Sequence, residues 1–262
     1  MEVLDLLVKS VEKIGSRFVL LKLTDDRNAL DAHILPGQFV EVRVDGSSTT
    51  FLRRPISICF VDYFANELWL LVAVVGDGTR RLSKLNPGER LNCILPLGNG
   101  FALPGTQSDA FGSRYLLVGG GVGVAPLLYM GSQLKVQGSE PVFLLGARTA
   151  DDLLLLDEFR KYGRVEVTTE DGSMGSKGFV TNHSLLKEEH FDHILTCGPT
   201  PMMKAVARYA CGQGIDCQVS LENMMACGLG ACLCCVEKTV RGNLCVCKDG
   251  PVFNVKELLW QN

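Results

Sequence analysis

Six of the eleven cysteines fall in the stretch MMACGLGACLCCVEKTVRGNLCVCKDGPVF, residues 224–253. Cys227, Cys232 and Cys235 follow the spacing C-x4-C-x2-C, and Cys247 is available as a fourth ligand further along. Four thiolates at this spacing suit a [2Fe-2S] cluster. The glycines between the first two cysteines permit the tight turns that wrap a cluster and aim amides at its sulfur atoms. The segment therefore favours an iron–sulfur site.

Zinc is the main alternative for these cysteines. It would take Cys232 and Cys235 with Cys245 and Cys247, but the C-x-C of the second pair is tighter than common structural zinc sites use. A group of unligated thiols packed this closely would be open to oxidation. We therefore rank zinc behind a cluster, with Cys234 and Cys245 as the expected non-ligands.

Two upstream segments have features of a dinucleotide site. In LLVGGGVGVAPLL an apolar strand runs into a run of glycines before an expected helix, and in TCGPTPMM a second strand ends in the same way. Amides at a helix start favour phosphate, and loops at the carboxyl ends of parallel strands face one crevice. Each loop alone also fits an ordinary strand-to-helix turn, and a lone cysteine there is more often a buried apolar residue. The candidate residues are Gly120, Gly121, Gly123, Cys197, Gly198 and Pro199.

The motif RRPISI, with Arg54 and Ser57, suggests a flavin contact. An arginine fork suits a pyrophosphate, and a serine hydroxyl can bond a flavin heteroatom. VVGDGT adds Gly78 and Thr79 as a second possible phosphate contact. A four-residue pattern also arises in surface turns, so this assignment depends on the other motifs.

Three successive elements are expected to position these residues. Residues 1–105 hold short β-branched strands between turn residues, which predicts an antiparallel β-barrel or sandwich. PGTQSDAFGS reads as a linker. Residues 106–220 alternate strands with helices, which predicts a doubly wound parallel α/β sheet. Residues 221–262 form a small C-terminal [2Fe-2S] domain.

Composition narrows the setting. A net charge of −3 provides no basic field for nucleic acid. The longest apolar runs are too short for a membrane span, and the opening MEVLDLLVKSVEKIG lacks the charged-then-apolar order of a signal peptide. Clustered thiols in a chain of this kind are more often metal ligands than disulfides. We expect a cytoplasmic protein without nucleic-acid or membrane partners.

The ordered motifs carry a family resemblance. RRPISI, GDGTRRL, LGNGF, GGGVGVAP, EDGSMGSKGFVT and CGPTPMM together resemble the ferredoxin reductase-like family, in which a flavin barrel precedes a nicotinamide-binding domain. The tail SLENMMACGLGACLCCV with CVCKDGPVF is similar to the electron-transfer subunits of type B, NAD-dependent dihydroorotate dehydrogenase. The likeness spans essentially the whole chain.

The resemblance implies FAD on a β-barrel over residues 1–105, NAD(H) on the α/β domain over residues 106–220 and a [2Fe-2S] cluster in the C-terminal domain over residues 221–262. It also implies an FMN-containing dihydroorotate dehydrogenase catalytic subunit as partner, in a heterotetramer of two plus two. Carried over by match, the FAD contacts are Arg54, Pro55, Ile56, Ser57, Leu71, Val72, Ala73, Gly78 and Thr79, with Glu222 near the flavin, and the iron ligands are Cys227, Cys232, Cys235 and Cys247. Cys234 and Cys245 leave the choice within each pair open.

The expected function is electron transfer from the partner's FMN through the cluster and FAD to NAD+, in pyrimidine (UMP) biosynthesis. No dihydroorotate site is recognisable in this chain, so its chemistry must come from cofactors. NAD is preferred to NADP because acidic residues follow FLLGAR, although Arg148 keeps NADP open. Alternatives are a reductase subunit of a sulfide dehydrogenase, ferredoxin-dependent transhydrogenase or hydrogenase, and a zinc-stabilised nucleotide-binding regulator.

Overall fold

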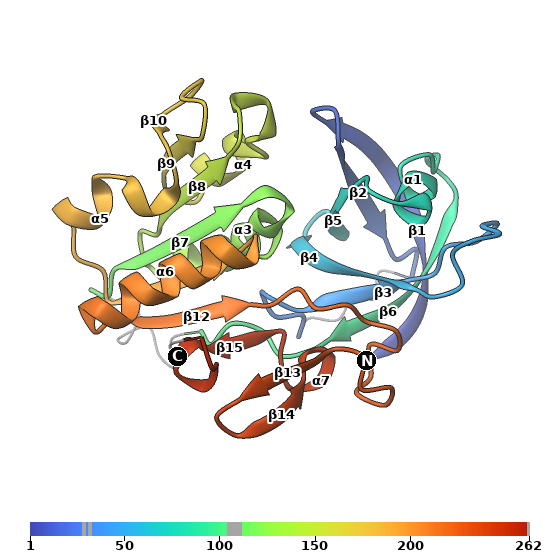
Figure 1. The fold of residues 1–262 in the computed structure, drawn as a ribbon. Coiled ribbons are helices and arrows are strands. Elements are labelled where there is room, and N and C mark those ends of the chain that lie inside the picture. Colours follow the sequence, from blue (N-terminus) through green and yellow to red (C-terminus); the bar gives the residue numbers. More distant parts are fainter. Residues whose placement is uncertain (28–29, 31–32, 104–111, 261–262) are drawn as a thin grey trace.

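A computed structural model describes residues 1–27, 30, 33–103 and 112–260. Figure 1 shows a barrel on the right, a layered sheet on the left and a small lobe with the cysteine segment below. The expected linker and the predicted boundary at residue 105 fall on residues 104–113, of which 104–111 lie outside the described part of the chain. The predicted domain limits therefore stay predictions.

Six antiparallel strands close the barrel in the order β1-β2-β5-β4-β3-β6. The strands are β1 (Glu2–Ile14), β2 (Phe18–Thr24), β3 (Phe39–Val42), β4 (Arg54–Asp62), β5 (Glu67–Ala73) and β6 (Arg90–Leu97), and the short helix α1 (Asp77–Leu82) follows β5. In β1, Leu4, Leu6 and Val8 alternate into the barrel core. The predicted barrel is confirmed, and its longest strand is the opening segment.

The second part of the fold is a seven-stranded sheet with the strand order β10-β9-β8-β7-β11-β12-β15. Its strands are β7 (Tyr115–Gly120), β8 (Val142–Ala147), β9 (Arg164–Thr169), β10 (Ser176–Lys177), β11 (His193–Cys197), β12 (Asp216–Ser220) and β15 (Val252–Asn254). The helical segments are η1 (Gly121–Val124), α3 (Ala125–Val136), η2 (Ala150–Asp152), α4 (Leu156–Arg160), η3 (Val180–Asn182), α5 (Leu185–Glu188) and α6 (Thr200–Gln213). All neighbouring strands are parallel except β15, so the predicted α/β class is confirmed.

The barrel and the sheet share a buried interface. Helix α3 lies between them and packs on β4, where the rings of Phe60 and Tyr129 are 5.8 Å apart between centroids. The Tyr129 hydroxyl donates to the carbonyl of Ile34 at 3.1 Å. No helix in the described part of the chain combines the length and apolarity needed to cross a membrane. The shared core places the barrel motifs close to the loops of the sheet.

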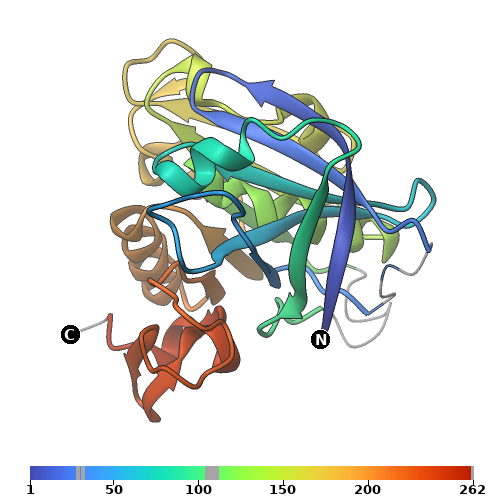
Figure 2. The same cartoon turned by 90° about the vertical axis from the view of Figure 1, so that its right-hand side faces the viewer.

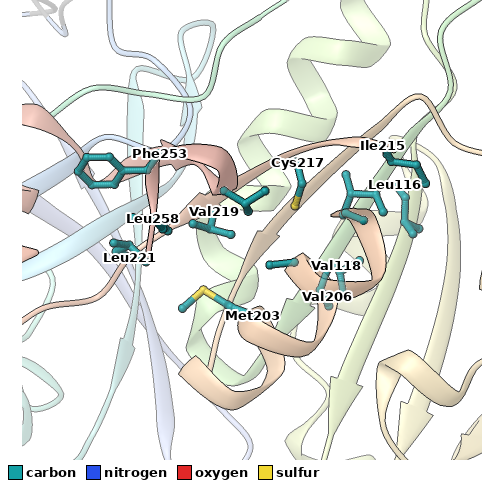
Figure 3. Close-up of a cluster of buried hydrophobic side chains, with 14 of the residues drawn as sticks. Leu116, Val118, Met203, Val206, Ile215, Cys217, Val219, Leu221, Phe253 and Leu258 are labelled. Carbon is teal, nitrogen blue, oxygen red and sulfur yellow. The ribbon is translucent and has the colours of Figure 1, made fainter. Parts of the chain in front are cut away.

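The cysteine lobe is tied to the sheet by its last strand. It contains β13 (Val236–Thr239), β14 (Gly242–Cys245), α7 (Val246–Asp249) and η4 (Val255–Glu257). Strand β15 pairs antiparallel with β12, and Phe253 joins Val219 and Leu221 in the core shown in Figure 3. Cys235 and Cys247 belong to the same core. The lobe is therefore held against the seven-stranded sheet by apolar burial.

Candidate functional site

The loop that carries the first three cysteines directs backbone amides at sulfur. Gly228 and Gly230 have φ of +67° and +80°, a region that glycine enters without strain. The Leu229 amide donates to Sγ of Cys227 at 3.3 Å, and the Gly230 amide donates to Sγ of Cys247 at 3.0 Å. Amides aimed at ligand sulfurs stabilise the charged thiolate. Hydrogen bonds from the Leu229 amide, which contributes most, and from the Cys232 and Ala231 amides lower the pKa of Cys227 to about 6.

The cysteines associate in pairs. Cys232 donates a side-chain hydrogen bond to Cys227, and Cys247 donates one to Cys235. A two-iron cluster takes two thiolates on each iron, so these pairs fit the donor set that it needs. Cys234 is exposed, whereas Cys235 beside it is buried. Among the described residues, no group of three or more His, Cys, Asp or Glu side chains is arranged to hold one metal ion.

The hydrogen-bond ladder of the barrel is interrupted at the RPIS motif. Arg54–Ser57 pairs with β3, but the pairing of β4 with β5 runs from Asp62 opposite Glu67 to Ile58 opposite Leu70 and goes no further. Along the RPIS motif, the edge of β4 that faces β5 is therefore not paired with it. Backbone groups left free in this way are the donors and acceptors that a flavin ring needs. Leu71 and Val72 bury their side chains in the two cores, so we expect any flavin contact from them through the main chain.

Arg54 and the α1 segment meet beside this unpaired edge. A Cβ added to Gly78 would lie 3.4 Å from Cγ and Cδ of Arg54. Thr79 fixes the turn into α1, because its hydroxyl accepts from the amides of Val75 and Gly76 at 3.0 and 3.1 Å. The RPIS and GDGT motifs, far apart in sequence, therefore form one surface with a cationic side chain. This surface fits a dinucleotide pyrophosphate.

The two glycine-bearing loops of the sheet face one cavity of about 530 Å³. Gly120, Gly121 and Pro199 line it, as do Ala147 and Arg148 at the end of β8. The loops touch because glycine is present at the contact. A Cβ on Gly123 would lie 2.5 Å from Cα and N of Gly198, far inside normal contact. The predicted convergence of the two loops is thus observed, with Gly123 as a packing residue outside the cavity lining.

Cys197 is buried beneath the cavity rather than in its lining. Burial, with a smaller contribution from the charge of Glu222, raises the pKa of its thiol to about 12. Cys197 is therefore a neutral thiol at physiological pH. Glu222 is exposed at the end of β12, close enough to influence Cys197.

Sequence reasoning missed Glu41. It lies within the apolar run QFVEVRV, is 1% exposed, and neither carboxylate oxygen has a hydrogen-bond partner among the described residues. It stands opposite Pro55 in the β3–β4 register, and a Cβ on Gly228 would lie 2.8 Å from its Oε1. Glu41 thus sits between the RPIS strand and the cysteine loop. A charged residue inside an apolar strand was the available signal.

An ion pair across the cavity was also missed. Arg17, in the turn between β1 and β2, places Nη2 2.5 Å from Oδ1 of Asp152 in η2. Both residues line the 530 Å³ cavity with the glycine loop. Figure 1 and Figure 2 together show this barrel turn beside the segment that leads into α4. Spacing along the chain could not reveal the pair, since 135 residues separate its members.

The barrel, the sheet with its cavity and the paired cysteines define the class of protein: a flavin- and iron–sulfur-dependent oxidoreductase subunit that binds NAD. Two family models match. One, described as the iron-sulfur cluster binding domain of dihydroorotate dehydrogenase B, covers residues 222–259, and an oxidoreductase NAD-binding domain covers residues 117–208. Both matches coincide with the segments described above.

Curated relatives identify the family. A Bacillus velezensis protein is 38% identical over 257 residues, 97% of each chain, and a Geobacillus protein is 40% identical over 227 residues, 86% of each chain. Both are named dihydroorotate dehydrogenase B (NAD(+)), electron transfer subunit. This chain belongs to the family of dihydroorotate dehydrogenase B electron transfer subunits.

Solved structures agree on the fold. An NADH-dependent reduced ferredoxin–NADP oxidoreductase has a chain with a TM-score of 0.86 and 31% identity, covering 98% of this chain and 91% of that one. An Amycolatopsis cytochrome P450 reductase has a TM-score of 0.65 and 26% identity, covering 79% of this chain and 65% of that one. The same architecture therefore serves several electron-transfer proteins.

Proposed function

We propose that this chain is the electron-transfer subunit of a dihydroorotate dehydrogenase, carrying electrons from the FMN of a dihydroorotate-oxidising partner to NAD+ in pyrimidine (UMP) biosynthesis. The observation that carries the proposal is the contiguity of the three sites. Glu41 of β3 faces the RPIS strand and the cysteine loop, while the barrel turn at Arg17 lines the dinucleotide cavity. Sites that adjoin one another in this way favour a relay within one chain.

The cofactors, when bound, supply the redox chemistry, with the flavin able to exchange one or two electrons. The protein's own groups position them. Cys227, Cys232, Cys235 and Cys247 would hold the irons of the cluster, and the Leu229 and Gly230 amides would orient the thiolates of Cys227 and Cys247. Arg54 and Thr79 would contact the flavin pyrophosphate, and the β4 edge at Ser57 would contact the flavin ring.

The first experiment is a visible spectrum of anaerobically purified protein, with iron, sulfide and flavin assayed on the same sample. Flavin bands over a broad iron–sulfur absorption, at two iron per FAD, are expected. Addition of NADH should bleach the flavin bands. A colourless protein that contains zinc would refute the proposal.

The catalytic partner is expected to dock over the cysteine lobe. Met224, Leu229 and Leu233 expose 82%, 46% and 64% of their surface next to the cluster loop. Exposed apolar side chains grouped at one site are typical of protein interfaces. An FMN-containing subunit seated here would bring its cofactor near the cluster, and two such pairs would form a heterotetramer. Clustered cysteines that serve as metal ligands favour a cytoplasmic setting, where thiols stay reduced.

A second candidate is the reductase subunit of a ferredoxin-dependent transhydrogenase, because the solved NADH-dependent reduced ferredoxin–NADP oxidoreductase shares 31% identity. Reconstitution separates the two. Addition of the FMN subunit should give dihydroorotate-dependent reduction of NAD+. If ferredoxin supports NADP+ reduction and dihydroorotate does not, the second candidate replaces the first.

A further inference from the structure

Four charged side chains line the dinucleotide cavity, two of each sign: Arg17, Arg148, Asp152 and Glu170. Asp152 and Glu170 follow the second and third strands of the sheet, β8 and β9. In sheets of this type the pyrophosphate lies at the loop after the first strand, and the adenosine ribose lies near an acidic residue beyond the second. Asp152 therefore stands at the ribose end of the cavity.

Asp152 is held on a well-braced loop. The Asp152 amide donates to the carbonyl of Thr149 at 3.1 Å, and the amide of Ala150 donates to Oγ of Ser173 at 2.8 Å. The amides of Glu170 and Asp171 bond the carbonyls of Ala147 and Arg148. These contacts join the loops after β8 and β9, so the Asp152 carboxylate has a defined position.

Arg17 reaches this loop from the other domain. Its carbonyl accepts from the Val74 amide at 2.8 Å, which ties the β1–β2 turn to the end of β5. Gly15 in the same turn has φ of +59°, and a Cβ there would lie 3.1 Å from the carbonyl oxygen of Asp151. The barrel turn and the η2 loop are thus in close approach. The Arg17–Asp152 pair bridges them at 2.5 Å, with the Asp152 side chain 18% exposed.

We propose that the Arg17–Asp152 ion pair sets the preference for NAD(H) over NADP(H), which rests on the proposed function. A 2′-phosphate would need a free cation at the ribose end. Asp152 pairs with Arg17, so this guanidinium is not available to a phosphate. The Asp152 carboxylate would also repel a phosphate dianion. A ribose 2′-hydroxyl carries no charge and is accepted beside Asp152 as a hydrogen-bond donor. Removing the Asp152 charge frees Arg17 to act with Arg148 as a phosphate fork.

The test is calorimetric binding of NAD+ and NADP+ to oxidised holoprotein, in which neither ligand can react. Asp152→Asn should lower the ratio of the NADP+ to the NAD+ dissociation constant at least about tenfold, since one repulsive charge is lost and one cation is freed. Arg17→Gln/Asp152→Asn should lose most of that gain. The matched control is Glu189→Gln, which breaks the ion pairs to Arg114 and Arg164 away from this cavity and should leave the ratio unchanged.

Three results are decisive. A ratio for Asp152→Asn within twofold of wild type would overturn the inference, as would a double variant that keeps the full gain. Flavin and cluster absorption measured on each variant shows that the holoprotein is intact. If the wild type binds neither nucleotide, the proposed NAD(H) function fails first, so the two failures are told apart.

Discussion

Glu41 is a carboxylate that the fold removes almost completely from water, with 1% of its surface exposed. Burial raises its pKa to about 7 from the ordinary 4.5, and the positive charges of Arg54 and Arg53 oppose this only in part. A carboxylate without hydrogen-bond partners costs free energy when buried. The folded chain therefore favours the protonated acid, placed between the flavin strand and the cluster loop.

This gives a pH prediction. Between about pH 4.5 and 7 the folded state keeps the Glu41 proton that the unfolded state releases, so the free energy of unfolding falls as pH rises through that window. Glu41→Gln should remove this loss, which amounts to about 3 kcal/mol above pH 7. Denaturant unfolding of wild type and variant at pH 5 and pH 8 measures it.

The control is Glu12→Gln at an exposed position paired with Lys22. The free energy of unfolding of this variant should differ from that of the wild type by the same amount at both pH values. A constant difference between Glu41→Gln and wild type from pH 5 to pH 8 would show that Glu41 does not titrate in the window.

Gly123 can be tested by substitution, with Gly212 as the matched control. Gly123→Ala would push a methyl group against the Gly198 backbone, which has no side chain to move aside, and should destabilise the protein by about 1–3 kcal/mol. It should also weaken NAD+ binding at least about tenfold, because the loops that line the cavity must separate.

Gly212 lies in α6, and a Cβ there meets nothing within 4 Å. Gly212→Ala should therefore leave NAD+ binding unchanged and stabilise the helix by about 0.5–1 kcal/mol. Thermal unfolding and calorimetry compare the two variants. Equal effects of both changes would contradict the assignment of Gly123 to the loop contact.

At the scale of elements, the cluster loop depends on the backbone turns that Gly228 and Gly230 allow. The loop brings Leu229 and Gly230 amides to sulfur and buries Cys235 against Cys247. Amides fixed in this way tune a cluster as well as hold it. The exposed Cys234 lies outside the hydrogen-bonded pairs described above.

Serine substitutions should separate ligands from neighbours. Cys235→Ser and Cys247→Ser are expected to lose most iron and sulfide, because each removes a thiolate from the cluster. Cys234→Ser and Cys245→Ser should keep two iron per FAD. Iron and sulfide assays with visible spectra of all four variants decide the choice, and a cluster retained in Cys247→Ser but lost in Cys245→Ser would reverse it.

At the scale of the whole molecule, the cysteine lobe shares its core with the sheet through β15, so the exposed apolar residues of the loop sit on a fixed platform. Such a platform suits a partner that must hold its cofactor at a constant distance. Docking there would cover Leu229 and Leu233 without disturbing the dinucleotide cavity.

Leu229→Asp/Leu233→Asp should therefore weaken binding of the FMN subunit at least about tenfold, because buried charges at an interface centre are costly. Leu233 has φ of +58°, which aspartate accepts. Phe64→Asp, at a fully exposed barrel turn, is the control. Gel filtration of the mixed subunits measures association, with iron content confirming the cluster, and undiminished association would move the interface elsewhere.

The sequence by itself determined the barrel, the parallel sheet and the motif-bearing loops, because alternation, glycine placement and cysteine spacing are local properties of the chain. It also identified the candidate residues of the RPIS motif, the glycine loop and the cysteine cluster. The opening segment, which was weighed individually only as a signal sequence, is the longest strand of the barrel.

Only the tertiary structure decided what happens between distant segments. It placed Glu41 against Gly228, joined Arg17 to Asp152 and moved Cys197 beneath the cavity instead of into it. It also made the cysteine lobe part of the sheet through β15. Burial and ion pairing depend on distance in space, and residues far apart in sequence leave no periodic signal of the contact they will make.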